Sequence, residues 1–150
     1  MQAFAISKEG DLAITGDESG RVTLWNLLDG DALDTIEPVQ VNSANTIGAC
    51  KVALSTSHLF SVIGFTNNTV NVYDNEMGDV VAIFREHQSP IKYLFVLDDN
   101  RKILSSDGFN LCKVWQANNG QLLESITVAC SHLNLSPDLK YVVSGAGENT

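Results

Sequence analysis

The stretch Ile6–Gly16, ISKEGDLAITG, recurs three more times along the 150 residues of this chain. Its counterparts are LSTSHLFSVIG at Leu54–Gly64, VLDDNRKILSS at Val96–Ser106 and LSPDLKYVVSG at Leu135–Gly145. All four align without a gap, and each runs from an aliphatic residue through a polar turn to an apolar run that ends at a small residue. Self-similarity of this kind is the sequence signature of a repeat architecture.

The agreement continues downstream of this stretch. In the first three units a large aromatic residue comes nine residues after the small residue, and a glycine comes five residues after the aromatic. These residues are Trp25, Tyr73 and Trp115, followed by Gly30, Gly78 and Gly120. The aromatics are 48 and then 42 residues apart, so the changes in length fall after the glycine, in a variable loop. Residues 1–150 therefore form one partial domain, with units at about 1–36, 47–86, 90–128 and an incomplete 129–150.

Each unit has the pattern of four short strands. In the first unit the predicted strands are Gln2–Ser7, Leu12–Thr15, Arg21–Asn26 and Ala32–Ile36. The segments between them are rich in Gly and Asp, which favour tight turns. No sustained helical period is present. The sequence predicts an all-β fold.

The strand interiors favour one all-β architecture over another. Leu59–Gly64, Tyr93–Leu97 and Tyr141–Gly145 are apolar at consecutive positions, which predicts that both faces of their sheets are buried. A sandwich would alternate apolar and polar residues, because each of its sheets keeps one face in water. The radially stacked blades of a propeller cover both faces of every sheet.

These residues resemble WD40 repeats. Trp25-Asn26, Tyr73-Asp74 and Trp115-Gln116 stand where that family has its Trp-Asp dipeptide. The resemblance covers the whole chain and implies a WD40-type β-propeller segment of three to four four-stranded antiparallel blades. Because propellers generally hold about four to eight blades, we expect an incomplete ring.

The resemblance also implies a hydrogen-bonded set of His, Ser or Thr, Asp and Trp in each blade. By position, the members of this set are Thr15 and Trp25 in the first unit, His87, Ser105 and Trp115 in the third, and Ser144 in the fourth. The positions expected to hold Asp are Ser19, Asn67, Phe109 and Glu148, and Ile63 replaces the hydroxyl residue of the second unit. We therefore expect these blades to rely on apolar packing more than typical members do.

Composition restricts the partners. Apolar residues make up 44% of the chain and charged residues 18%, which is typical of a folded protein. A net charge of −9 without any basic run disfavours nucleic acid and anionic membranes and favours basic protein partners. Cys50, Cys112 and Cys130 include no CxxC pair, so we expect buried free thiols in a reducing compartment. Without a signal peptide or a membrane span, the expected location is cytoplasmic.

Motifs for chemistry are absent from the sequence. No GxSxG, GxxxxGK[ST] or GxGxxG occurs. His58, His87 and His132 fall in three different units without a second histidine nearby, which predicts no metal site. The group Asp29–Asp31 with Asp34 has two interpretations, a calcium loop or a solvated turn, and it lacks the ligand spacing of the former. We expect no catalytic residue, no cofactor and no metal, and thus no enzyme.

The function expected is a scaffold for protein-protein interaction, the WD40 region of a larger intracellular regulatory protein. Divergent arrays of this kind resemble the WD40 regions of NACHT- or STAND-type signalling ATPases. The long connection Glu37–Ala49 is either a docking loop for other proteins or a neutral insertion. The alternative function is a propeller enzyme or small-ligand binder whose site lies in other blades. The remainder of its own propeller is a further expected partner, because open blades expose apolar faces, and the isolated segment is expected to self-associate.

Overall fold

The chain is all-β in its computed structural model, which describes residues 3–37, 47–97, 100–107, 111–127, 132–136, 138 and 140–145. The strands of this part of the chain form three four-stranded antiparallel sheets and one two-stranded sheet. We call the three larger sheets blades 1, 2 and 3. The predicted all-β fold class, with antiparallel four-stranded blades, is confirmed.

Each blade is a meander in which consecutive strands pair. Blade 1 contains β1 (Ala3–Ile6), β2 (Leu12–Gly16), β3 (Val22–Asn26) and β4 (Ala32–Ile36). Blade 2 contains β5 (Ala49–Leu54), β6 (Phe60–Phe65), β7 (Val70–Asp74) and β8 (Val80–Phe84). Blade 3 contains β9 (Ile91–Val96), β10 (Lys102–Asp107), β11 (Leu111–Gln116) and β12 (Leu122–Thr127). The small sheet pairs β13 (His132–Leu135) with β14 (Val142–Gly145).

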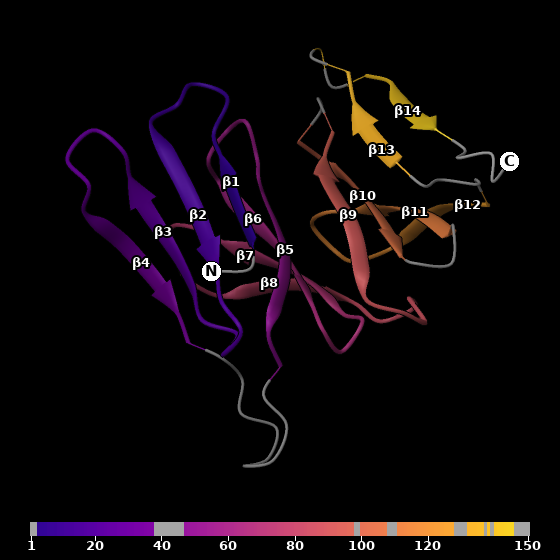
Figure 1. Cartoon of the computed structure of the whole chain (residues 1–150), viewed down its shortest axis with the longest axis horizontal. Helices are drawn as coiled ribbons and strands as arrows, with labels where there is room; N and C mark the ends of the chain where they lie inside the picture. Colours follow the sequence, from indigo (N-terminus) through magenta and orange to yellow (C-terminus); the bar gives the residue numbers. More distant parts are fainter. Residues whose placement is uncertain are drawn as a thin grey trace, which may run out of the picture.

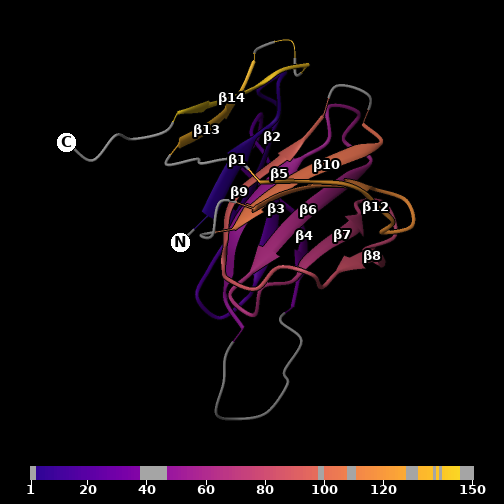
Figure 2. The ribbon, with the colours of Figure 1, turned by 90° about the vertical axis from the view of Figure 1, so that its right-hand side faces the viewer.

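The blades fan out from their first strands. β1 lies beside β5, and β5 lies beside β9, so the first strands of the three blades form the inner side of the fan. In Figure 1, blade 1 lies on the left, blade 3 lies on the right, and the β13–β14 sheet lies above blade 3. Figure 2, a quarter turn away, looks along this stack and shows the sheets lying one behind another. This is the arrangement of neighbouring propeller blades.

The core is divided into layers between the blades. Val62 and Ile63 are neighbours on β6 and both are fully buried, one in the layer against blade 3 and the other in the layer against blade 1. Successive side chains of a strand point to opposite faces, so blade 2 is covered on both sides. The prediction that consecutive apolar residues mark a doubly buried sheet is confirmed for this strand.

Small residues at the end of the second strand let the blades approach each other. A Cβ atom on Gly16 would lie 2.7 Å from Cβ of Ala49, and one on Gly64 would lie 3.0 Å from Cβ of Ile91. Both distances are shorter than ordinary van der Waals contacts. The small residue that ends each repeated stretch is therefore required where the next blade's first strand packs against it.

The prediction that consecutive apolar residues mark a doubly buried sheet is wrong for Tyr141–Gly145. Tyr141 is 67% exposed and Val143 is 65% exposed, and all four residues of β14 are exposed. Only Leu133, on β13, is buried, in a small cluster with Cys112 of blade 3. Burial of a blade strand depends on the sheet that packs over it, and no described sheet covers β14.

No helix in the described residues is long and apolar enough to cross a membrane.

Candidate functional site

Strand direction alternates within each blade, so its turns gather at two ends. The turns between first and second strands and between third and fourth strands lie at one end, which we call the turn face. It comprises residues 7–11, 27–31, 55–59, 75–79, 100–101 and 117–121. The turns between second and third strands and the connections between blades lie at the opposite end. Loops held by rigid sheets are the usual place for binding residues.

The turn face combines exposed apolar side chains with carboxylates. Leu28 is 85% exposed, Met77 is 75% exposed and Leu59 is 65% exposed. The turn that carries Leu28 also carries two exposed aspartates, and the turn that carries Met77 carries exposed acidic residues on both sides of it. These acidic residues are Asp29, Asp31, Glu76 and Asp79. A large apolar residue exposed within an acidic rim is typical of a binding surface.

A hollow of about 480 Å³ opens between blades 2 and 3 at the same end of the molecule. Leu59 and Val81 line it from blade 2, and Arg101 and Asn118 line it from blade 3. The turns that bound the hollow are joined across the two blades. Asn100 accepts a hydrogen bond from the backbone N–H of Thr56 at 2.8 Å and donates one to its hydroxyl at 2.6 Å. The walls of the hollow are therefore fixed relative to each other.

A buried hydrogen-bonded chain ties blade 3 together. Trp115 Nε1 donates to Ser105 Oγ at 2.7 Å, Ser105 Oγ lies 2.6 Å from His87 Nε2, and His87 Nδ1 lies 3.2 Å from Asp107 Oδ2. When the Ser105 hydroxyl donates to Nε2, the proton of a neutral imidazole lies on Nδ1 and is donated to Asp107. Burial lowers the pKa of His87, which keeps the imidazole neutral, although Asp107 acts in the opposite direction. The predicted members His87, Ser105 and Trp115 are confirmed by these contacts.

Asp107 was missed by the sequence prediction, which assigned the acidic position of this unit to Phe109. Phe109 lies outside the described residues. Ser105 and Asp107 are two residues apart on β10, so both side chains point to the face on which His87 lies. The spacing i, i+2 from the hydroxyl residue is the signal that reveals this carboxylate, and the expectation that this blade lacks one is wrong.

Blades 1 and 2 have smaller hydrogen-bonded sets at the equivalent positions. In blade 1, Trp25 Nε1 donates to Thr15 Oγ1 at 2.9 Å, as the sequence predicted. In blade 2, the apolar Ile63 is fully buried, and the Tyr73 hydroxyl is instead 3.3 Å from Asn71 Nδ2, which donates to it. Burial raises the pKa of Tyr73. Among the described residues, the hydrogen-bonded sets of blades 1 and 2 are thus smaller than that of blade 3.

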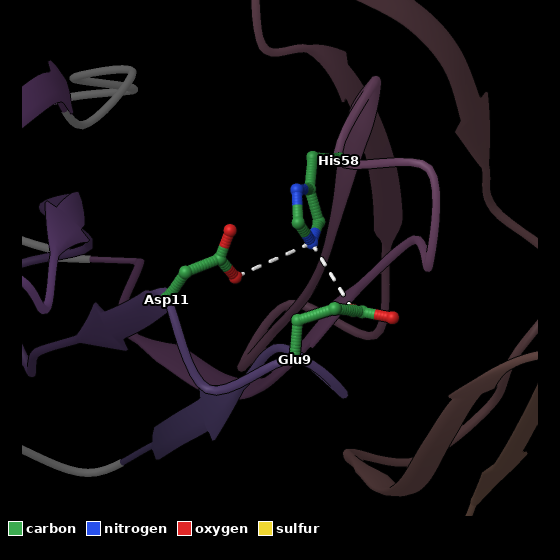
Figure 3. A group of neighbouring side chains, drawn as sticks. All are labelled: Glu9, Asp11 and His58. Carbon is green, nitrogen blue, oxygen red and sulfur yellow. Dashed lines mark ion pairs between the residues drawn. The ribbon is translucent and has the colours of Figure 1, made fainter.

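The structure brings together three residues that the sequence did not associate. Glu9 and Asp11 lie in the β1–β2 turn of blade 1, and His58 lies in the equivalent β5–β6 turn of blade 2. Figure 3 shows the two carboxylates and the imidazole pointing toward one another. His58 Nε2 is 3.5 Å from Glu9 Oε2 and 3.6 Å from Asp11 Oδ1. A hydrogen bond from Ser7 is the main cause that lowers the pKa of Asp11.

The other sequence candidates have structural explanations or lie outside the described residues. Asp29 accepts hydrogen bonds from Asn26 Nδ2 at 2.9 Å and from the Asp31 backbone at 3.0 Å, so it stabilises its own turn. The middle of the predicted docking loop, residues 38–46, lies outside the description, as do Cys130 and Glu148. Cys50 is half-buried and Cys112 is buried, and neither forms a disulfide within the described residues.

Comparison with solved structures identifies the fold. One similar structure, "Crystal structure of RRP9 WD40 repeats", superposes with a TM-score of 0.75 and 11% sequence identity. A second, "Structure of U3-55K", gives a TM-score of 0.76, also at 11% identity. The chain has the WD40 β-propeller fold. Each match covers 88% of this chain and 40% of the other, so the chain spans about two fifths of the length of these WD40 structures. No protein-family model and no curated protein sequence matches.

Proposed function

We propose that this WD40 segment is an interaction scaffold that binds other proteins through its turn face. The observation that carries the proposal is the set of three exposed apolar side chains on the turn face, Leu28, Leu59 and Met77. The turns of Leu28 and Met77 also carry exposed carboxylates. A few anchor residues supply most of the energy of a protein interface, and a charged rim favours partners of opposite sign. The partner is therefore a protein segment that offers basic residues around a large apolar one.

The wider context is part of the same proposal. The segment belongs to a larger cytoplasmic regulatory protein, of the NACHT or STAND signalling type, and packs against the remainder of its propeller. Two apolar residues of blade 1 support packing against the remainder of the propeller. Phe4 is 65% exposed and Ile6 is 58% exposed on the face turned away from blade 2. The equivalent face of blade 3 is covered by blade 2, where Phe84 stacks on Trp115 with ring centroids 4.6 Å apart.

A displayed peptide library tests the interaction face. We expect selection on the full chain to enrich peptides that combine Lys or Arg with Leu, Phe or Trp. Leu28→Ser and Met77→Ser should each abolish the enrichment, because they remove the apolar anchors without touching the core. Val143→Ser is the matched control, since Val143 is as exposed as Leu59 but lies on β14. Enrichment of acidic peptides, or enrichment that survives both substitutions, would contradict the proposal.

A small-ligand binder is the second candidate, favoured by the hollow between blades 2 and 3. Its volume of about 480 Å³ falls in the range of small-molecule sites, about 300–1,000 Å³. Leu59 and Val81 provide apolar walls, and Arg101 and Asn118 provide polar groups. Fragment screening by NMR separates the two candidates. Saturable shifts confined to these residues, without competition from the selected peptides, would favour the ligand site.

A further inference from the structure

We propose that Glu9, Asp11 and His58 form a binding site for a divalent transition-metal ion, best matched by Zn²⁺, that joins blade 1 to blade 2. The three ligand atoms come from two equivalent turns of neighbouring blades and all lie within 4.8 Å of one another. This assignment is independent of the partner-binding role proposed above. It differs from the sequence expectation, in which the three histidines fall in separate units and provide no metal site.

The distances fit tetrahedral coordination. With Zn–N and Zn–O bonds of about 2.0–2.2 Å, tetrahedral ligand atoms are about 3.3–3.6 Å apart. His58 Nε2 lies 3.5 Å from Glu9 Oε2 and 3.6 Å from Asp11 Oδ1. These two distances match a tetrahedral site, and the ligand oxygens of Glu9 and Asp11 lie within 4.8 Å of each other, so a bound ion would draw the two carboxylates together. An imidazole ligand favours zinc and its transition-metal neighbours over Ca²⁺ and Mg²⁺, which prefer oxygen.

The position of His58 Nε2 suits coordination of a metal ion better than a hydrogen bond. His58 Nε2 is shielded from solvent and has no hydrogen-bond partner among the described residues. A protonated imidazole that pairs with a carboxylate usually brings the two atoms to about 2.7–2.9 Å. Here the nitrogen stands almost equally far from two carboxylates, with all three atoms around one point (Figure 3). An ion at that point would satisfy the nitrogen and neutralise the two acidic groups.

His58 points its side chain across the blade boundary toward Glu9 and Asp11 from a turn position with a left-handed backbone (Figure 3). Its φ of 59° is in the left-handed region, and the equivalent positions of the other two turns hold Gly10 at 76° and Asn100 at 49°. Glycine and asparagine adopt this conformation readily, and histidine does so at some cost. The backbone is held by two hydrogen bonds, His58 N to Ser55 O at 3.1 Å and Asn75 Nδ2 to His58 O at 2.9 Å.

The carboxylate of Asp11 is oriented in the way expected of a metal ligand. Ser7 is buried, and its hydroxyl donates to Asp11 Oδ1 at 2.6 Å while accepting from the Leu12 backbone at 3.0 Å. Ligating carboxylates are typically fixed by such a supporting hydrogen bond. Glu9 has a more exposed side chain, at 55%, and supplies the adjustable ligand. Water completes the coordination on this open side.

Calorimetric titration of the metal-stripped full chain with ZnCl2 at pH 7 tests the site. We expect one equivalent of Zn²⁺ to bind and to raise the melting temperature, because an ion that binds only the folded state stabilises it. Glu9→Gln, Asp11→Asn and His58→Asn should each weaken Zn²⁺ binding by more than about tenfold. His58→Asn retains a side chain that suits the left-handed backbone, as Asn100 does in blade 3. His132→Asn, at an exposed histidine on β13, is the control and should bind like the parent.

Substitution with Co²⁺ identifies the ligands. We expect visible absorption bands typical of a four- or five-coordinate site with nitrogen and oxygen ligands, and we expect them to vanish in His58→Asn. A folded chain that takes up no Zn²⁺ would overturn the assignment. Binding that survives His58→Asn, or a thiolate charge-transfer band that points to Cys50 or Cys112, would overturn it as well.

Discussion

Trp25 and Trp115 occupy the same position of the repeated unit and have different surroundings. Trp115 is 2% exposed, stacks on Phe84 of blade 2 and donates to Ser105, which continues to His87 and Asp107. Trp25 is only partly buried, and its indole donates to Thr15 on the open face of blade 1. The repeated sequence therefore determines which hydroxyl residue each tryptophan bonds within its own blade. The neighbouring blade determines how deeply the tryptophan is buried and how much it stabilises the fold.

Truncation of the two tryptophans should have the largest effect on stability and should differ most between blades 1 and 3. We expect Trp115→Ala to lower the free energy of unfolding by about 3–5 kcal/mol, the range for large aromatics removed from a core. Trp25→Ala should cost clearly less, because Trp25 is less deeply buried than Trp115. Urea unfolding followed by circular dichroism measures both. Equal losses would show that the neighbouring blade adds little to the environment of Trp115.

A larger side chain at the glycine where blades 2 and 3 pack closely should have the next largest effect on stability. Gly64→Val places a branched side chain against Ile91, and overpacking of this kind costs about 1–3 kcal/mol. Gly145→Val is the matched control at the same repeat position. Among the described residues, the nearest atom to a Cβ there would be Cβ of His132, at 4.0 Å. Thermal unfolding of both variants should show a loss for Gly64→Val and little change for Gly145→Val, and a loss of the same size in both would contradict the blade contact.

The buried histidine should make stability depend on pH in a narrow window. Because burial lowers the pKa of His87 in the folded state, the unfolded state takes up a proton first as the pH falls through the ordinary histidine value of about 6.5. The free energy of unfolding should therefore fall with decreasing pH, by at most about 1.4 kcal/mol per pH unit. Urea midpoints at pH 7.5 and 5.5 measure the change.

Two histidine variants test whether His87 causes this pH dependence. His87→Gln should remove the pH dependence at some cost in stability, because it removes the buried interaction between His87 and the carboxylate of Asp107. His132→Gln alters an exposed histidine and should keep the slope of the parent. A parent chain whose stability rises on acidification would contradict a lowered pKa for His87. The acidic groups Asp11, Asp17 and Asp138 do not interfere, because their pKa values are lowered below 3.8.

The sequence predicted the strands well because strand formation depends on local pattern. The four strands expected in the first unit occur at Ala3–Ile6, Leu12–Gly16, Val22–Asn26 and Ala32–Ile36, with every bound within one residue of the prediction. The hydroxyl and tryptophan pairs were predictable for the same reason, since both partners lie on adjacent strands of one blade. Turn residues and apolar runs carry this information at short range.

Contacts between units were less predictable, because they depend on distances in space that the sequence does not state. The cluster of Glu9, Asp11 and His58 joins turns of different blades that are almost 50 residues apart in sequence. Asp107 was overlooked because the alignment pointed to Phe109 two positions later. Tyr141 and Val143 were assigned to a core from their hydropathy, whereas their burial depends on a covering sheet.

The stacking of Phe84 on Trp115 across the boundary between blades 2 and 3 provides the most direct test of the propeller arrangement. A double-mutant cycle with Phe84→Leu, Trp115→Leu and the double variant measures their coupling from urea unfolding. The rings are parallel within 7° and their centroids are 4.6 Å apart, so we expect a favourable coupling of about 0.5–1.5 kcal/mol. Strictly additive losses would contradict the packing of one blade against the next.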